Sequence, residues 1–493
     1  MPTPRTPFYL AIDPQKVGSG LQPDMHDIHK VLWAEAESVS FQHGRVRRRK
    51  PATLAITVDS AKPIRGISQL QDSNGVRWIW GNAGDLVKRW YGPSVDLIDT
   101  YTNWSEDQGV LYNASFTDFV PYGDWMVFNN SRNTPRVYKP SGPSVGALGN
   151  IATAITTDIV TMMKKFDFML AIGYGADKRR VGWSDSGDIE EWVPATDNAA
   201  DSLTIDEFDT PIRAAARMGD AIAIYCEDQM AHLNYVGDPF WFGYKAKLDG
   251  IGAVGKRAVA SDGRINVGVS RNGVWWTDGI SFRYIDEGFL RTYLQDNVNW
   301  DQASKIVAAR NDVSGCFEFS FPTGASDDPS EAWGFDPRTG AWYEVPVFSD
   351  KDERRLFDRP LLGSLDGKIY YDEDASSDNS LVLKTKPLLA MLQTENGMID
   401  IHNAVHCQYI DVMLKTASNI QMRIGSCNEP GGTYTYSTWI DLLAGYYTYP
   451  VPRGVPSGVY HKLEFQSTST TWDMDLQGFM LFGNVEGVKR EFP

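Results

Sequence analysis

The feature that most constrains this chain is a strand-turn-strand pattern that recurs along it. In each copy a Gly, Asn or Asp turn adjoins a strand of alternating apolar and polar residues, and a second strand ends near an aromatic residue. A period of two is typical of a strand with one buried face, and these turn residues tolerate the positive φ of a hairpin. The copies lie at residues 75–90, 122–140, 165–192, 218–237, 261–279, 330–346 and 361–374.

Seven copies at intervals of roughly 40–50 residues indicate the blades of a β-propeller, each a small antiparallel sheet. The copies are degenerate, so six or seven blades are predicted, and a pair of β-sandwiches is the alternative. Segments near 141–165 and 289–312 break the pattern, the second with helical spacing, and are predicted to be small insertions. From about Lys386 the strands lengthen, as in an antiparallel β-sandwich. The predicted fold is all-β, with a propeller and N-terminal arm over residues 1–385 and a sandwich over 386–493.

The charge of the chain limits its partners. A formal net charge of −16 argues against tight wrapping of nucleic acid, which needs Lys and Arg to displace counterions. A surface that nucleic acid passes without adhering remains compatible with this charge. No signal peptide and no apolar run of about 18 residues occur, so we expect a non-secreted chain without a membrane-spanning segment. Four widely spaced cysteines predict reduced thiols and synthesis in a reducing cytosol: Cys226, Cys316, Cys407 and Cys427.

Few groups in the sequence point to catalysis, and we predict no enzyme, no cofactor and no metal. The stretch "WSDSGDIEEW" (183–192) is similar to the Asp-box turns of sialidase-type propellers, which are structural even in glycosidases. A sialidase-like enzyme would also need three arginines that converge on a carboxylate, together with a tyrosine nucleophile. No local motif singles out such a group, so a carbohydrate-active propeller stays as the alternative.

Potential metal ligands each have a simpler interpretation. The loop with Asp372, Asp374 and Asp378 could supply oxygens to Ca²⁺, but it lacks the Gly and distal Glu of an EF-hand, and a solvated turn is favoured. Strand-like spacing favours structural roles for a second set: His402, His406 and Cys407, with His26 and His29. The glycines of "GIGAVG" (250–255) lack the context of a phosphate-binding loop and are interpreted as a flexible turn between blades.

The sharpest electrostatic feature is a basic run within "FQHGRVRRRK". Its members are Arg45, Arg47, Arg48, Arg49 and Lys50. On a strand both faces would be largely charged, so the strand is expected at a sheet edge or an assembly interface. A solvated edge and direct contact with DNA are the alternatives. We predict that these five residues form an assembly interface that pairs with acidic surface on a neighbouring subunit.

The N-terminal stretch 18–56 resembles the opening of tail nozzle proteins of short-tailed bacteriophages, also called tubular tail or tail hub proteins. The matching residues are Gly20-Leu21-Gln22-Pro23-Asp24, then Gly44, then Arg49-Lys50-Pro51, where the family usually has Lys-Arg-Pro. Three later stretches are similar to blade segments of the same family: "RVGWSDSGDIEEWVP", "KLDGIGAVGKRAVASDGRINVGVSRNGVWWTDG" and "AWGFDPRTGAWYEV". Together the matches spread over most of residues 18–346.

This resemblance implies a structural virion protein in the phage tail, assembled in the host cytoplasm. It implies a homo-oligomeric ring, usually a hexamer, that continues the DNA ejection channel below the portal and adaptor and carries tail fibres or spikes. Genomic DNA would pass through without specific binding, because an acidic lumen does not retain the phosphate backbone. A glycan- or fibre-binding role for the C-terminal module is a further alternative.

Overall fold

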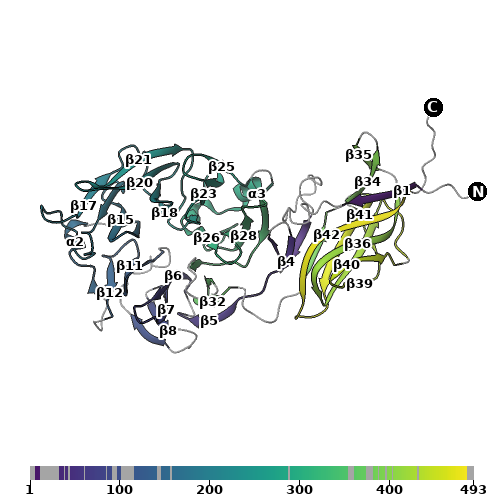
Figure 1. The fold of residues 1–493 in the computed structure, drawn as a ribbon, viewed down its shortest axis with the longest axis horizontal. Helices are drawn as coiled ribbons and strands as arrows, with labels where there is room; N and C mark the ends of the chain where they lie inside the picture. The colour runs from purple at the N-terminus through teal and green to yellow at the C-terminus, as the bar shows by residue number, and fades with distance from the viewer. Residues whose placement is uncertain are drawn as a thin grey trace, which may run out of the picture. The chain divides into compact units, whose positions relative to one another are not determined.

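The computed structural model consists almost entirely of antiparallel strands (Figure 1). It describes residues 6–11, 33–37, 39–42, 45–59, 62–84, 86–91, 97–101, 116–140, 146–155, 158–286, 289–352, 360–372, 381–386, 388–394, 397–401, 404–429, 432–452 and 454–485. The chain divides into two compact units. We call residues 52–333 and 345–372 the propeller unit, and residues 1–51, 334–344 and 373–493 the terminal unit.

Seven four-stranded antiparallel sheets occur in the part of the chain that the structure describes. Their strands, in sheet order, are β6 (Ile64–Gln71), β7 (Arg77–Ala83), β8 (Leu86–Tyr91), β9 (Leu97–Tyr101); β10 (Asp118–Tyr122), β11 (Trp125–Asn129), β12 (Arg136–Tyr138), β13 (Gly146–Ala147); β14 (Thr161–Lys165), β15 (Phe168–Tyr174), β16 (Arg180–Trp183), β17 (Asp201–Thr204); β18 (Ala214–Met218), β19 (Ala221–Tyr225), β20 (Gln229–Gly237), β21 (Trp241–Asp249); β22 (Val259–Ser261), β23 (Asn266–Ser270), β24 (Gly273–Thr277), β25 (Phe282–Tyr284); β26 (Val307–Asn311), β27 (Cys316–Phe321), β28 (Glu331–Asp336), β29 (Ala341–Glu344); and β30 (Asp350–Asp352), β31 (Leu361–Gly363), β32 (Lys368–Tyr371), β5 (Thr53–Thr57).

The sheets follow one another around a ring, as in a β-propeller (Figure 1). First strands contact first strands, β6 with β10 and β10 with β14, and then β18 with β22, β22 with β26, and β26 with β30. The ring closes because β30 contacts β6 and because β5, from the start of the unit, is the outer strand of the last sheet. Every predicted hairpin is a pair of strands, although the 330–346 hairpin forms the third and fourth strands of its sheet.

Burial of the second strands differs from the predicted alternation. All seven residues of β15 are buried, because neighbouring sheets cover both of its faces. Leu170 and Ile172 pack toward β19, whereas Met169 and Ala171 pack toward β11. This strand is therefore apolar on both faces, where the predicted alternation would leave one face in solvent.

Both predicted insertions contain more regular structure than expected. The first includes α2 (Ile151–Ala154), but its last residues are β14, the first strand of a sheet. The second contains the predicted helices, α3 (Phe289–Asn297) and the 3₁₀ helix η2 (Trp300–Lys305), and then β26. Among the described helices, none is long and apolar enough to cross a membrane.

The terminal unit contains two larger antiparallel sheets. The six-stranded sheet has the order β3-β4-β42-β36-β40, with β1 also paired to β42. Its strands are β1 (Thr6–Ala11), β3 (Val39–Gln42), β4 (Arg45–Arg48), β36 (Val405–Ser418), β40 (Gly445–Pro450) and β42 (Asp473–Val485). The eight-stranded sheet comprises β2 (Trp33–Glu37), β33 (Val382–Thr385), β34 (Leu388–Thr394), β35 (Gly397–Ile401), β37 (Ile420–Cys427), β38 (Thr435–Tyr436), β39 (Ile440–Asp441) and β41 (Tyr460–Ser467).

Aromatic rings join these two sheets. Trp33 of β2 contacts Phe465 of β41 and Phe479 of β42, with centroids 6.1 and 6.2 Å apart. The N-terminal strands belong to this unit, since β1 and β4 pair with β42 and β2 pairs with β33. The prediction that the N-terminal arm belongs with the propeller over residues 1–385 is therefore wrong. Pairing with strands near the far end of the chain, rather than proximity in sequence, decides where these strands lie.

Candidate assembly surfaces and the propeller cavity

The basic run forms a strand, as predicted, but that strand is not at an edge. In the six-stranded sheet β4 lies between β3 and β42, and Val46 is fully buried. Two of the arginines pair with Asp475 of β42, at 3.6 Å for Arg45 and 3.5 Å for Arg47. The charge that suggested an edge is thus partly compensated within the chain.

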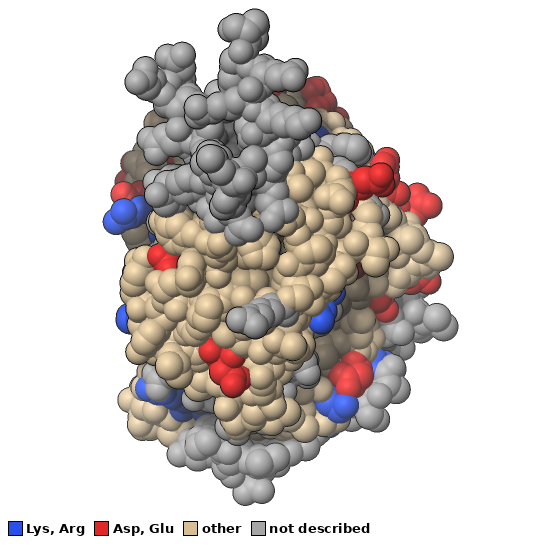
Figure 2. All heavy atoms as spheres, turned by 90° about the vertical axis from the view of Figure 1, so that its right-hand side faces the viewer, with Lys and Arg blue, Asp and Glu red and all other residues tan. Residues whose placement is uncertain are grey.

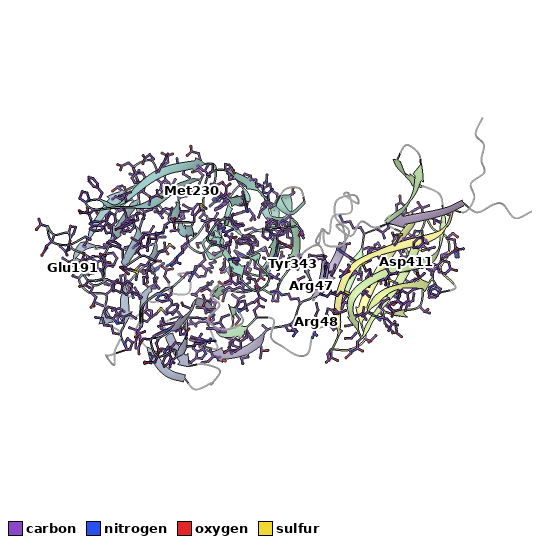
Figure 3. The ribbon with its side chains drawn as sticks, in the orientation of Figure 1. Arg47, Arg48, Glu191, Met230, Tyr343 and Asp411 are labelled. Carbon is purple, nitrogen blue, oxygen red and sulfur yellow. The ribbon has the colours of Figure 1, made fainter. Side chains whose placement is uncertain are left out.

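The remaining basic residues lie in different environments. The Arg48 guanidinium lies 5.7 Å from the centre of the Trp472 ring, within the range of a cation–π contact. Arg49 is buried and Lys50 is exposed. Figure 3 labels Arg47 and Arg48 on this strand. The five residues therefore do not present one continuous basic surface, and whether any of them contacts another subunit remains a prediction.

A better-exposed surface lies at the other end of the same sheet. Among the described strands β40 pairs with β36 only, so one side of its backbone has no neighbouring strand. Large apolar side chains are exposed on and beside these two strands. We call them the aromatic edge: Tyr409, Met413, Leu443, Tyr446 and Tyr447. The sequence signal was "GYYTYP", a strand with aromatic residues on both faces, which only an edge position leaves exposed.

The aromatic edge carries little free charge. Asp411 of β36 accepts hydrogen bonds from the Tyr446 hydroxyl at 2.5 Å and from the Thr448 hydroxyl at 2.6 Å. The carboxylate of Asp411 raises the pKa of the Tyr446 hydroxyl that donates to it. Figure 2 shows the face of the molecule that lies at the right of Figure 1. Uncharged residues (tan) predominate there among the described residues, and acidic (red) and basic (blue) residues form small separate groups. Figure 3 labels Asp411. Such a surface suits contact between protein chains, where Tyr and Met are enriched.

The propeller unit contains a cavity of about 630 Å³ on its axis. All seven first strands contribute residues to its wall, from Ile67 of β6 to Asp350 of β30. Charged residues of both signs are part of its wall, although the Lys351 side chain is itself fully buried: Asp118, Lys164, Arg217, Lys256, Arg257, Asp262, Arg310, Asp312, Asp350, Lys351 and Asp352. The cavity is therefore polar without a dominant sign of charge.

Lys256 spans this cavity near the beginning of the first strands. It lies in the loop before β22 and reaches Asp118 of β10, in a sheet that does not neighbour its own, with a nitrogen–oxygen distance of 2.9 Å. Its ammonium also donates to the Phe116 carbonyl at 3.0 Å and to the Ser131 hydroxyl at 2.8 Å. Burial lowers the pKa of Lys256, and Asp118 partly opposes that effect.

Arg257 forms a second connection across the cavity. It donates to the Thr117 carbonyl at 3.0 Å and lies 3.6 Å from Asp350 of β30. Burial raises the pKa of Asp350, whereas Arg257 and the backbone N–H groups of Lys351 and Ile67 oppose the rise. Side chains from three sheets therefore meet on the axis, and their ion pairs cross the cavity at this end of the propeller.

The loop that carries Lys256 is closely packed, unlike the flexible turn expected for "GIGAVG". A Cβ on Gly252 would lie 2.2 Å from the backbone of Glu227, and one on Gly255 would lie 2.9 Å from that of Ser304. Glycine is needed here because the backbone of another segment occupies the space of a side chain. Tight packing holds Lys256 in place to reach across the axis.

The cavity contains three arginines but does not combine them as the glycosidase alternative requires. Arg257 is engaged as described, Arg310 pairs with Asp312 at 3.2 Å, and Arg217 is exposed. None of the described lining residues is a tyrosine. The Asp-box-like turn is structural: Asp185 accepts backbone hydrogen bonds from Ser186 and Ala199, each at 2.8 Å.

The other candidate ligands are placed as follows. Asp372 is buried and pairs with Lys351, so it is not part of a solvated turn, whereas Asp374 and Asp378 lie outside the described residues. Cys407 is buried on β36, which raises its pKa to about 12, and its neighbour His406 is half-buried. His26, His29 and His402 lie outside the described residues. All four cysteines are free thiols, as predicted.

In the comparisons with known proteins, no family model and no curated protein matches this chain. Solved structures do match it. The β-propeller domain of Cps50 (Swd1) from Myceliophteria thermophila is 10% identical, covers 66% of this chain and 100% of its own, and has a TM-score of 0.41. YCF48 from Cyanidioschyzon merolae is 10% identical, with 63% and 96% covered and a TM-score of 0.39. A fungal alcohol oxidase of the AA5 family, in complex with copper, is 9% identical, with 88% and 98% covered and a TM-score of 0.37. These similarities concern the fold alone.

Proposed function

We propose that this chain is a structural subunit of a ring-shaped tail nozzle of a short-tailed bacteriophage. In this proposal the seven four-stranded sheets are seven propeller blades, and the two sheets of the terminal unit form a β-sandwich. The ring continues the DNA ejection channel and binds the adaptor and the tail fibres or spikes. The order of the sequence motifs supports this assignment, together with the absence of any predicted catalytic group.

The observation that carries the proposal is the aromatic edge on a chain of charge −16. Copies with this charge repel one another, so they associate most readily through surface with little net charge. The edge strand β40 offers such a surface, because among the described strands it pairs on one side only and it carries exposed aromatic side chains. We assign a second copy of this chain as its occupant, in the head-to-tail contact that closes a ring.

The ion pairs that cross the propeller axis bear on the path of DNA. Because Lys256 and Arg257 span the propeller cavity, DNA would pass through the space enclosed by the ring of subunits and not through a single propeller. The acidity of the chain then repels the phosphate backbone across the whole bore.

The test is the oligomeric state of the full chain, by native mass spectrometry and electron microscopy. We expect rings that persist or increase with added salt, since salt screens the repulsion between copies. Met413→Asp places a charge on the aromatic edge and should abolish the rings, whereas Ile280→Asp, at an exposed apolar residue of the propeller unit, should leave them intact. Rings that dissociate with salt would favour the basic strand as the interface. Monomers under all conditions, even with the adaptor present, would contradict the proposal.

The axial cavity favours a second candidate, a carbohydrate-active or glycan-binding propeller. A polar cavity of about 630 Å³ with donors and acceptors of both charges is large enough for a sugar unit. Release of sugar from host polysaccharide by the purified chain, lost in Arg310→Met, would support this candidate over the structural one.

A further inference from the structure

A buried lysine in the last sheet of the propeller unit lies between two carboxyl groups. Lys351 is the middle residue of β30, and its side chain is fully buried. Its ammonium nitrogen lies 2.6 Å from Oδ2 of Asp372, just after β32, and 2.7 Å from Oε2 of Glu318 on β27. Both carboxyl side chains are only 1% exposed. Three reactive groups thus meet in a site that excludes bulk water.

Asn311 orients the two carboxyl groups. Its side-chain amide donates to Oε1 of Glu318 at 3.2 Å and lies 3.5 Å from Oδ2 of Asp372. Each carboxyl therefore turns one oxygen toward the lysine. The backbone N–H of Asp372 donates to the Pro360 carbonyl at 3.0 Å, which fixes the position of the aspartate.

From this geometry we propose that Lys351 and Asp372 form an intramolecular isopeptide bond, with Glu318 as the proton carrier. The Lys351 ammonium gives one proton through Glu318 to the Asp372 carboxylate, which leaves a neutral amine beside a carboxylic acid. The amine nitrogen attacks Cγ of Asp372, a nitrogen–carbon bond forms, and one carbon–oxygen bond breaks. Glu318 carries a second proton from nitrogen to the departing oxygen, which leaves as water, and Glu318 ends as the carboxylate it was.

The fold supplies what this condensation needs. In water an ammonium and a carboxylate do not condense, because both ions are well solvated. In a buried site the charged forms lose that solvation, so the neutral, reactive pair costs less. Fixed proximity adds effective concentrations on the order of 10⁵–10⁸ M for well-oriented groups. The bond would tie β30 to the end of β32 in the sheet that closes the ring with β5. The proposal of this bond does not depend on the proposed tail function.

The chain contains an internal control for this chemistry. Lys256 and Asp118 are a second buried lysine–aspartate pair, 2.9 Å apart. An asparagine contacts the aspartate in both places, but Asp118 also accepts a hydrogen bond from the Met162 backbone N–H, which stabilises the carboxylate. No glutamate is among the described contacts of this second pair, so it has no group to carry the proton. We therefore expect no bond at this second pair.

The test is the mass of the purified full chain under denaturing conditions. The expected mass is below that of the sequence by one water molecule. Tryptic digestion should yield one branched peptide that joins residues 339–354 to residues 369–384, uncleaved after Lys351. Asp372→Ala should restore the full mass, and Glu318→Gln, which keeps both reacting groups, should slow bond formation at least tenfold.

Two results would overturn the proposal. One is a wild-type chain that keeps the full mass after prolonged incubation, which would make the cluster an ion triad only. The other is a water loss that maps to Lys256, or to a bond between Lys351 and Glu318. Both are read on the wild-type chain, so the outcome does not depend on whether the variants fold.

Discussion

Replacing Lys256 by methionine tests whether the ion pair between Lys256 and Asp118 stabilises the propeller unit. The side chains of Lys256 and Asp118 are 9% and 8% exposed, so the substitution leaves a buried carboxylate without its cation. Breaking a buried pair in this way costs about 3–5 kcal/mol. Two further acceptors, the Phe116 carbonyl and the Ser131 hydroxyl, lose their donor as well. We therefore expect a loss of about 3–5 kcal/mol in the free energy of unfolding.

Arg271→Met is the matched control. Arg271 and Glu227 lie 3.6 Å apart, but their side chains are 62% and 42% exposed, and water screens such a pair to about 0–1 kcal/mol. For a unit of roughly 300 residues, the loss in Lys256→Met corresponds to a fall in Tm of about 5–8 °C. The Arg271 variant should shift Tm by no more than about 2 °C.

Urea unfolding followed by tryptophan fluorescence measures both variants, and hydrogen exchange locates the loss in the propeller unit. The double variant Lys256→Met with Asp118→Asn removes the uncompensated charge and should recover part of the stability. If the Lys256→Met variant is no less stable than the Arg271→Met variant, the ion pair of Lys256 and Asp118 does not stabilise the propeller unit and the prediction is wrong.

Three further predictions concern the remaining features. Burial lowers the pKa of His461 to about 4, so between pH 6.5 and 4 the unfolded chain binds more protons than the folded chain. The free energy of unfolding of the terminal unit should therefore fall by up to about 3 kcal/mol as the pH drops through that range. In urea titrations His461→Gln should make this free energy less dependent on pH. Asp475→Asn leaves two arginines of β4 without their carboxylate and should cost about 0.5–1 kcal/mol, less at high salt, in the same assay. Gly252→Ala forces a Cβ against the Glu227 backbone and should cost about 1–3 kcal/mol, whereas Gly146→Ala, with open space around it, should be tolerated in thermal unfolding.

Much of the propeller could be predicted from local patterns. The turn between β11 and β12 contains Asn130 and Asn133, and the one between β23 and β24 has Asn272 next to Gly273. Hairpins are local structures, so the residues that specify them are adjacent in the sequence. The hairpin of β26 and β27 was missed because it follows directly on the helical segment. Free thiols and the structural role of the Asp-box-like turn were also predictable, since composition and turn chemistry decide them.

The site could not be predicted in the same way. Lys256 and Lys351 are single lysines in unremarkable sequence, and their partners lie far away in the chain, at Asp118 and at Glu318. Asp372 was interpreted as part of a solvated acidic loop because its neighbours in sequence are polar. In the structure it is buried and forms an ion pair with Lys351. Local composition does not indicate which charge will be buried or which partner will compensate it.

The sequence by itself determined that the chain is built from antiparallel hairpins, because side-chain period and turn residues act over a few positions. Only the tertiary structure decided which strands share a sheet. It placed β1 and β4 beside β42 and β2 beside β33. The basic strand lies inside a sheet and not at the expected edge, and β40 is an edge in the described part of that sheet. The physical reason is that strand pairing uses backbone groups that every residue carries, so its partners are selected by packing across the whole chain and not by the local sequence.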